Sequence, residues 1–219
     1  MTSIDLNSIW NDAFTNEIQR ASQREAEKSL WRKGGRATKD NPDKENGEWW
    51  NTSGHQMFLS WVKWRNMVNW SIWETPDGTP AIELELMVPF ADQYVKMGID
   101  RVMVMPTGEL VILDLKSGQR TPTNDLQLAF YAAGLEKTFG VRAQYGVYWM
   151  ARTASTSIPV SLDKYPTSMV EHIIADFAAQ RDLGIYIPNL GSCGMCGVQE
   201  YCSWVGGSKA IVSIESKGK

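Results

Sequence analysis

Apolar side chains recur along the chain with two different periods, which predicts alternating helices and strands. Apolar residues return every three or four positions in four segments, where we expect amphipathic helices: 3–30, 53–73, 123–138 and 167–183. Short apolar runs, some alternating with polar residues, predict five strands: 82–89, 99–105, 110–116, 144–151 and 157–162. Residues 32–51 and 187–219 show neither period and are expected to be irregular.

The order of these elements predicts an α/β or α+β fold with a mixed central β-sheet flanked by helices. The first three strands follow one another closely and can form an antiparallel meander. The helix at 123–138, with Thr123 or Asn124 as its predicted N-cap, is long enough to cross over to the strand at 144.

Composition narrows the class of protein. A chain of 219 residues can form one domain with a substantial core, and it contains no run of about eighteen uncharged apolar residues that would predict a transmembrane helix. The first residues lack the features of an export signal, so a cytosolic location is expected. A formal net charge of -3 argues against non-specific coating of nucleic acid, so any contact with DNA must be local.

Tryptophan is unusually frequent in the first third of the chain. Eight of the ten tryptophans precede residue 74, namely Trp10, Trp31, Trp49, Trp50, Trp61, Trp64, Trp70 and Trp73. Core packing is the simpler explanation for most of them, and stacking on unpaired bases is the functional alternative.

The two strands at 99–105 and 110–116 carry charged residues at their ends. Asp114 and Lys116 are two residues apart on one strand and therefore project to the same face, where they could hold a metal ion and a water, or form only a solvated ion pair. Asp100 can join them only in one register. Pairing of Met105 with Leu110 would turn Asp100 to the opposite face, so a metal site requires a three- or five-residue loop, or a bulge.

Three linked motifs give the chain a family resemblance. The sequence contains Gly98-Ile-Asp100, Asp114-Leu-Lys116 and then Gln127-x3-Tyr131, and this order resembles the RecB-like exonuclease branch of the PD-(D/E)XK nuclease superfamily. The resemblance covers about residues 54–202. It implies a single nuclease domain with a restriction-endonuclease-like core, divided into an amino-terminal helix and loop (1–53), a catalytic core (54–186) and a cysteine-rich segment with the tail (187–219).

The resemblance also implies a metal site. In that family two carboxylates, a histidine and a backbone carbonyl hold Mg²⁺ or Mn²⁺, which places these roles on Asp100, Asp114, His55 and Leu115. Lys116 would position the attacking water. Hydrolysis would then be an in-line displacement at phosphorus, made feasible near neutral pH by the charge of the metal.

Further family roles fall on side chains around that site. Gln127 and Tyr131 are four residues apart on one helix face and can address the same groove. Glu85 resembles an acid that supports the site, although Glu83 shares its face and stays an alternative.

The three cysteines lie within ten residues, at Cys193, Cys196 and Cys202. In a cytosolic chain this spacing favours a metal site over a disulfide. It resembles the iron-sulfur motif of RecB-like nucleases, but a [4Fe–4S] cluster takes four thiolates and no further cysteine is present. The fourth ligand could be solvent, an aspartate or a histidine such as His172; alternatively the site holds Zn²⁺, or no metal at all.

Together these features predict a metal-dependent DNA nuclease, with exonuclease action on ends or single strands in recombination, repair or phage DNA processing. DNA contacts are expected from Arg32, Lys33 and Arg120, with Gln127 and Tyr131 at the site. We also expect a helicase or recombination partner, no association with a membrane and, for a phage-encoded protein, a location in the host cytoplasm. The alternatives are an inactive nucleic-acid-binding or scaffold subunit and, more remotely, a zinc- or redox-centred regulator.

Overall fold

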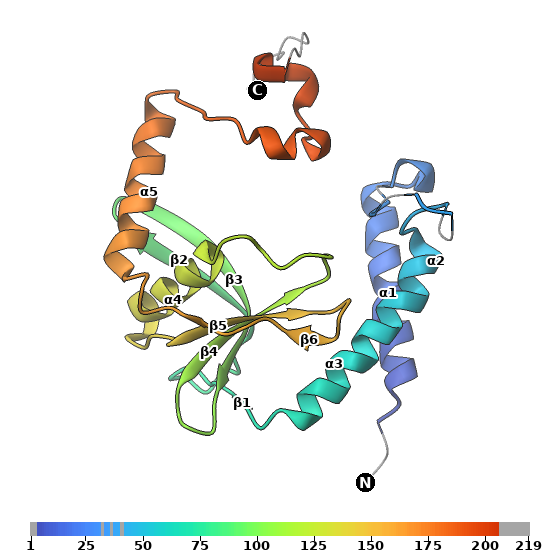
Figure 1. Ribbon diagram of the computed structural model, residues 1–219, viewed down its shortest axis with the longest axis horizontal. Helices are drawn as coiled ribbons and strands as arrows, with labels where there is room; N and C mark the ends of the chain where they lie inside the picture. Colours follow the sequence, from blue (N-terminus) through green and yellow to red (C-terminus); the bar gives the residue numbers. More distant parts are fainter. Residues whose placement is uncertain (1–3, 32, 36, 40–41, 206–219) are drawn as a thin grey trace, which may run out of the picture.

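The computed structural model describes residues 4–31, 33–35, 37–39 and 42–205, which form a curled β-sheet with helices on both faces (Figure 1). The strands are β1 (Ser71–Ile72), β2 (Ile82–Phe90), β3 (Gln93–Val104), β4 (Leu110–Lys116), β5 (Tyr145–Met150), β6 (Ser155–Thr156) and β7 (Val160–Ser161). The α-helices are α1 (Leu6–Arg24), α2 (Gly47–Trp49), α3 (His55–Met67), α4 (Leu126–Phe139) and α5 (Thr167–Asp182). A π-helical turn, Trp50–Gly54, joins α2 to α3.

The sheet is mixed. Its main strand order is β1-β3-β4-β5-β6, while β2 pairs with β3 and β7 pairs with β5. Strands β4 and β5 run parallel, and the other pairs are antiparallel. Helix α4 makes the crossover that a parallel pair requires. The predicted mixed sheet flanked by helices is therefore confirmed.

Apolar side chains form a core on each face of the sheet. Helices α4 and α5 cover the face that carries Val102 and Ile112, whereas α3 packs on the face that carries Leu113 and Trp149. Core packing accounts for several of the tryptophans, which lie within or against these two cores: Trp61, Trp64, Trp70, Trp73 and Trp149. The simpler explanation for the tryptophan content therefore holds for these residues.

One glycine sets how closely α4 approaches the sheet. A Cβ at Gly146 of β5 would lie 2.7 Å from Cδ1 of Leu128 on α4, closer than such atoms can pack. Because the position is glycine, Leu128 lies directly over the strand and is fully buried. The first turn of α4, which carries Gln127, is thereby held against the sheet.

The second predicted helix ends earlier than its pattern indicated. Helix α3 ends at Met67, Val68 is extended, and Ser71–Ile72 pairs with Met103 and Val104 of β3. The apolar residues after Met67 therefore belong to a strand and its flanks. The helical spacing continued by chance across this break, so periodicity alone placed the boundary too late.

Other boundaries also moved by a few residues. Helix α1 covers Leu6–Arg24 instead of 3–30, and the strand predicted at 157–162 is reduced to Val160–Ser161. The N-cap of α4 is Asp125, not Thr123 or Asn124. Asn124 nevertheless accepts a hydrogen bond from the Leu126 amide (3.3 Å), so the cap prediction missed by one residue.

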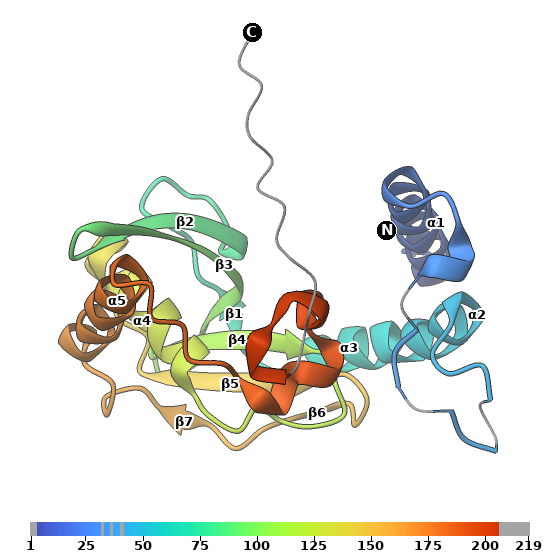
Figure 2. The ribbon, with the colours of Figure 1, turned by 90° about the horizontal axis from the view of Figure 1, so that it is seen from above.

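The amino-terminal helix lies against α3 (Figures 1 and 2), where Trp10 stacks on Phe58 with ring centroids 5.9 Å apart. The cysteine-bearing segment continues beyond α5 and contains short 3₁₀ turns at Leu190–Met195, Gln199–Tyr201 and Ser203–Val205. Within the described residues, no helix is long and apolar enough to cross a membrane. The proposed division at residues 53 and 186 stays a prediction.

Candidate active site

The β3–β4 hairpin has the register that a metal site requires. Val104 pairs with Leu110 and Arg101 with Leu113, so the connection between the paired strands is five residues long. Continuing this register by one residue places Asp100 across from Asp114, on the same face of the sheet. The Asp100 carboxylate also accepts a hydrogen bond from the Leu115 amide (2.6 Å), which ties the end of β3 to β4.

Asp114 is a buried acid, only 2% exposed, and its Oδ2 atom is shielded from solvent. The Lys116 ammonium lies 2.6 Å from that oxygen as an ion pair. Burial raises the pKa of Asp114, the Lys116 charge partly opposes the increase, and the negative charge of Asp100 adds to it. Two neighbouring carboxylates, one of them buried, form a natural binding site for a cation.

Lys116 is connected to helix α4 through Gln127, which is in turn hydrogen-bonded to Tyr131. Its ammonium donates to the Gln127 side chain (2.8 Å), and the Gln127 amide donates to the Tyr131 hydroxyl (2.8 Å). Burial raises the pKa of Tyr131, and the nearby charge of Asp114 raises it further, so this phenol stays protonated at neutral pH. The structure therefore brings Asp114, Lys116, Gln127 and Tyr131 together on one face.

The donor set fits a hard divalent cation in part. Carboxylate and carbonyl oxygens are the ligands that Mg²⁺ prefers, and Asp114 offers a buried carboxylate beside Asp100. The carbonyl of a strand residue points to the same side as its amide, so the Leu115 carbonyl is directed toward Asp100, which accepts from that amide. Among the described residues, no three His, Cys, Asp or Glu side chains lie close enough to hold a metal.

The family model of the PD-(D/E)XK nuclease superfamily matches residues 9–203. The chain belongs to this superfamily. Its curled mixed sheet with flanking helices is accordingly a restriction-endonuclease-like fold, and the superfamily implies a nuclease.

A curated relative adds a phage connection to the superfamily assignment. The chain is 31% identical over 180 residues to the Gene 69 protein of Mycobacterium phage D29. The match covers 72% of this chain and 66% of the phage protein, so the chain spans just under two thirds of that relative's length.

The histidine expected in a PD-(D/E)XK site of this type lies apart from the aspartates. His55 stands at the start of α3, and its ring stacks on Trp10 with centroids 5.7 Å apart. Its Nε2 atom is buried and has no hydrogen-bond partner. Among the residues that the structure describes, His55 does not form a ligand set with Asp100 and Asp114, and its metal role stays a prediction.

The candidate supporting acids have other partners. Glu85 is an exposed residue that pairs with Lys96 (3.1 Å), and Glu83 pairs with Arg101 (3.1 Å). Glu83 also has a φ of 50°, so the side-chain alternation that grouped it with Glu85 is interrupted there. Neither of these pairs includes Asp100 or Asp114.

Two of the basic residues expected to contact DNA lie on the exposed surface. Arg120 and Lys33 are exposed on loops, and Arg32 lies outside the described residues. The structure brings neither Arg120 nor Lys33 into the group formed by Asp114, Lys116 and Gln127.

The three cysteines are free thiols. Cys193 and Cys202 are half-buried and Cys196 is exposed. They are not gathered into a metal-binding group within the described residues. The metal expected from the spacing of these cysteines therefore stays a prediction, since thiolate ligands converge on a metal only when it binds.

The motifs did not identify Tyr148. This residue of β5 pairs with Asp114 across the parallel strands and lies under the Lys116 ammonium, 5.7 Å from its ring centroid. Burial raises the pKa of Tyr148 to about 12, with a further contribution from the charge of Asp114. The parallel pairing of β4 with β5 places Tyr148 beside Asp114, but the register of this pairing could not be predicted from the sequence.

The motifs also missed Arg152, which joins three segments of the chain. Its guanidinium donates to the Ser117 carbonyl (2.7 Å) and to the buried carboxylate of Glu45 (2.8 Å). It also lies over the rings of Trp49 (5.0 Å) and Trp50 (5.6 Å). Arg152 thereby links the amino-terminal loop to the end of β4, directly after Lys116.

Proposed function

We propose that this protein is a Mg²⁺- or Mn²⁺-dependent deoxyribonuclease that hydrolyses phosphodiester bonds. The observation that carries the proposal is the register of the β3–β4 hairpin, which sets Asp100 across from Asp114 beside the ammonium of Lys116. Membership of a nuclease superfamily makes nucleic acid the substrate class.

Asp100, Asp114 and the Leu115 carbonyl would hold the metal. A bound divalent ion supplies charge that stabilises the negative charge developing on the phosphate and lowers the pKa of water. The protein's own contribution is positional. Lys116, held between Asp114 and Gln127, presents a fixed ammonium that can orient a water for attack on phosphorus. Tyr131, protonated at neutral pH, anchors Gln127 and so limits the movement of Lys116.

The experiment compares hydrolysis of end-labelled DNA by wild type and by Asp114→Asn, with Mg²⁺, with Mn²⁺ and with chelator. We expect nucleotide release by wild type with either metal, and none from the variant or with chelator. Asp163→Asn, a change on the exposed surface, is the control and should retain activity. Absence of hydrolysis of both single- and double-stranded DNA by folded wild type would overturn the proposal.

We further propose exonuclease action on DNA ends or single strands. Linear DNA should then be degraded while covalently closed circular duplex resists, and a nicked circle distinguishes an end requirement from a single-strand requirement. The relative in a mycobacteriophage supports a setting in phage DNA processing, in the host cytoplasm, where a helicase or recombination protein would be a natural partner.

A subunit that binds DNA without cutting it is the alternative. Retention of Asp100, Asp114 and Lys116 in one group argues for the enzyme. The two functions separate cleanly, because a scaffold would bind labelled DNA equally well in wild type and Asp114→Asn and would release no nucleotide from either.

We also propose a metal in the cysteine segment, either an iron-sulfur cluster or Zn²⁺. The support is the confinement of all three cysteines to ten residues of sequence. Protein purified without oxygen should contain iron and sulfide, or zinc, in amounts that fall in Cys196→Ser. Metal-free wild-type protein with unchanged folding would count against it.

A further inference from the structure

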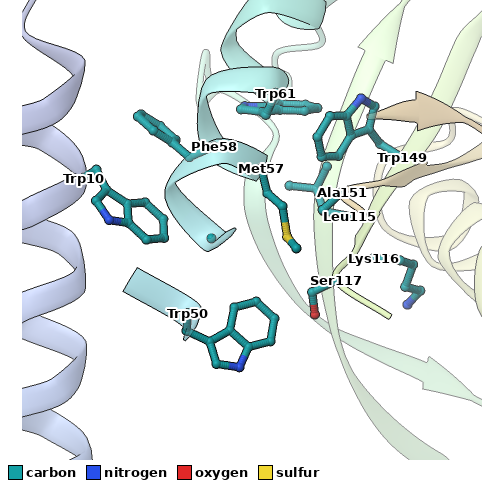
Figure 3. A pocket seen from close by; sticks show the side chains of 11 residues that line it. Trp10, Trp50, Met57, Phe58, Trp61, Leu115, Lys116, Ser117, Trp149 and Ala151 are labelled. Carbon is teal, nitrogen blue, oxygen red and sulfur yellow. The ribbon is translucent and has the colours of Figure 1, made fainter. Parts of the chain in front are cut away.

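An apolar pocket lies beside the candidate active site, between α3 and the ends of β4 and β5. Its volume is about 260 Å³. The walls come from several segments and are largely aromatic: Trp10, Trp50, Gly54, Met57, Phe58, Trp61, Leu115, Lys116, Ser117, Trp149 and Ala151. Figure 3 shows Trp10 and Trp50 across the space from Leu115 and Ala151, with the side chain of Met57 between them.

The pocket and the candidate active site share the end of strand β4. Lys116 forms part of the pocket wall and also pairs with Asp114 (2.6 Å). The Leu115 amide, in the adjoining wall residue, donates to Asp100. The Leu115 side chain points to the opposite face of the sheet from Asp114, so the pocket and the aspartates lie on either side of the end of β4, with Lys116 at the border between them. A DNA strand that passes around this end could have its phosphate at the aspartates and a neighbouring base at the aromatic walls.

We propose that this pocket binds an unpaired nucleobase of the DNA strand whose phosphate lies at Asp100 and Asp114. The inference rests on the proposed function, because it takes DNA as the substrate. A nucleobase is a flat ring system with two aromatic faces, and indole rings bind such faces by stacking without regard to sequence. The polar residues of the wall are Lys116 and Ser117, and Lys116 also pairs with Asp114.

Binding of an unpaired base in this pocket would explain the proposed preference of the protein for DNA ends or single strands as substrates. A base inside a duplex is covered on both faces by its stacked neighbours, so it cannot enter a pocket without unpairing and unstacking, which costs a few kcal/mol. A base at a frayed end or in a single strand enters with little of that cost. The pocket would thus select the form of DNA, while the aspartates and Lys116 act on the backbone.

The position of Trp50 in the wall is stabilised from outside the pocket. The Arg152 guanidinium lies 5.6 Å from the Trp50 ring and also holds the Ser117 carbonyl, which belongs to the opposite wall. At Gly54, a Cβ would lie 2.7 Å from the Trp10 ring, so glycine permits the close approach of Trp10 to the wall. The walls are therefore held in place before any ligand arrives.

The test measures binding separately from cutting. Asp114→Asn, without added metal, is titrated with a fluorescent single-stranded oligothymidylate and with oligonucleotides carrying one abasic nucleotide at successive positions. We expect one abasic position to weaken binding by about 5- to 150-fold, the range for loss of one base-aromatic contact. Other positions should change binding much less.

Two pocket variants, made in the Asp114→Asn background, link that effect to the pocket. Ala151→Phe fills the space and Trp50→Ala removes a wall, and either should abolish the penalty of the sensitive abasic position. Trp204→Ala, an exposed tryptophan outside the pocket, is the matched control and should keep it. Circular dichroism and thermal melting verify folding, and Ala151→Phe alone suffices if Trp50→Ala does not fold.

The outcomes distinguish this inference from the proposed function. The pocket's role is overturned if no abasic position weakens binding to the folded protein. It is also overturned if the sensitive position stays sensitive in both pocket variants, even when wild type degrades DNA. The nuclease proposal is overturned if wild type does not hydrolyse DNA. The proposed base pocket still holds in that case if one abasic position weakens binding and Ala151→Phe abolishes this effect.

Discussion

Asp114 combines two demands that conflict within one side chain. It is almost fully buried, which favours the neutral acid, yet it must be ionised to hold a cation. Its raised pKa records the cost of keeping it charged in the folded protein without metal.

Replacement of Asp114 by Asn should therefore stabilise the metal-free protein. An acid whose folded pKa is raised destabilises the fold once it ionises, so the gain should be present at neutral pH. The gain should shrink as pH falls through the raised pKa, and disappear below the ordinary value of 3.8. We expect about 1 kcal/mol at pH 7, measured by urea unfolding. A destabilised Asp114→Asn at pH 7 would contradict this account.

In the proposed reaction, Lys116 is the residue whose charge would be used most directly. Lys116→Met should reduce hydrolysis by about 100-fold or more, because the fixed ammonium that orients water is lost. Its hydrogen bond to Gln127 shows that the side chain is held, not mobile in solvent. Lys96→Met is the matched control, since Lys96 lies on β3 and pairs with the exposed Glu85. Equal rates for the two variants would remove Lys116 from the mechanism.

At the scale of elements, the turn between β3 and β4 decides whether the two aspartates meet. Gly108 has a φ of 96°, a conformation that other residues adopt only with strain. Gly108→Val should therefore destabilise the protein by about 1–3 kcal/mol and reduce hydrolysis through the loosened register, whereas Gly118→Val, without a positive φ, should have a much smaller effect on stability. Thermal unfolding measures both, and equal losses would show that the turn does not control the hairpin.

The link between the amino-terminal loop and β4 depends on one ion pair. Glu45 is 8% exposed and Arg152 is 18% exposed, so Arg152→Met leaves a buried carboxylate without its partner. We expect a loss of about 3 kcal/mol in unfolding free energy. Much of it should be recovered in the double variant Glu45→Gln, Arg152→Met, in which no unpaired charge remains. Arg181→Met, at an exposed ion pair, should cost less than about 1 kcal/mol.

At the scale of the whole molecule, metal binding and folding should be linked. A cation bound by Asp100 and Asp114 only in the folded state raises the unfolding free energy, by about 2.7 kcal/mol at a concentration one hundred times its Kd. Mg²⁺ or Mn²⁺ should therefore raise the melting temperature of wild type and leave Asp114→Asn unchanged. An equal rise in both proteins would place the bound ion elsewhere.

Much of the architecture was predictable because it depends on local patterns. The period of apolar residues identified the four longer α-helices and the longer strands, since it records which face of each element is buried. The linked motifs from Asp100 to Tyr131 were sufficient to predict the PD-(D/E)XK superfamily, and the alternation along the hairpin defined the register that the site would need. These features are contained within short stretches of chain.

Other features depended on how distant segments pack. The sequence alone could not choose the hairpin register, because several loop lengths satisfy the same apolar pattern. The sequence also could not predict that His55 stacks on Trp10 or that Glu85 pairs with Lys96. Arg152 and Glu45 are 107 residues apart in sequence, and the aromatic pocket draws its walls from α1, α3 and two strands. Such contacts arise only when the sheet and its helices pack together, so only the tertiary structure decided them.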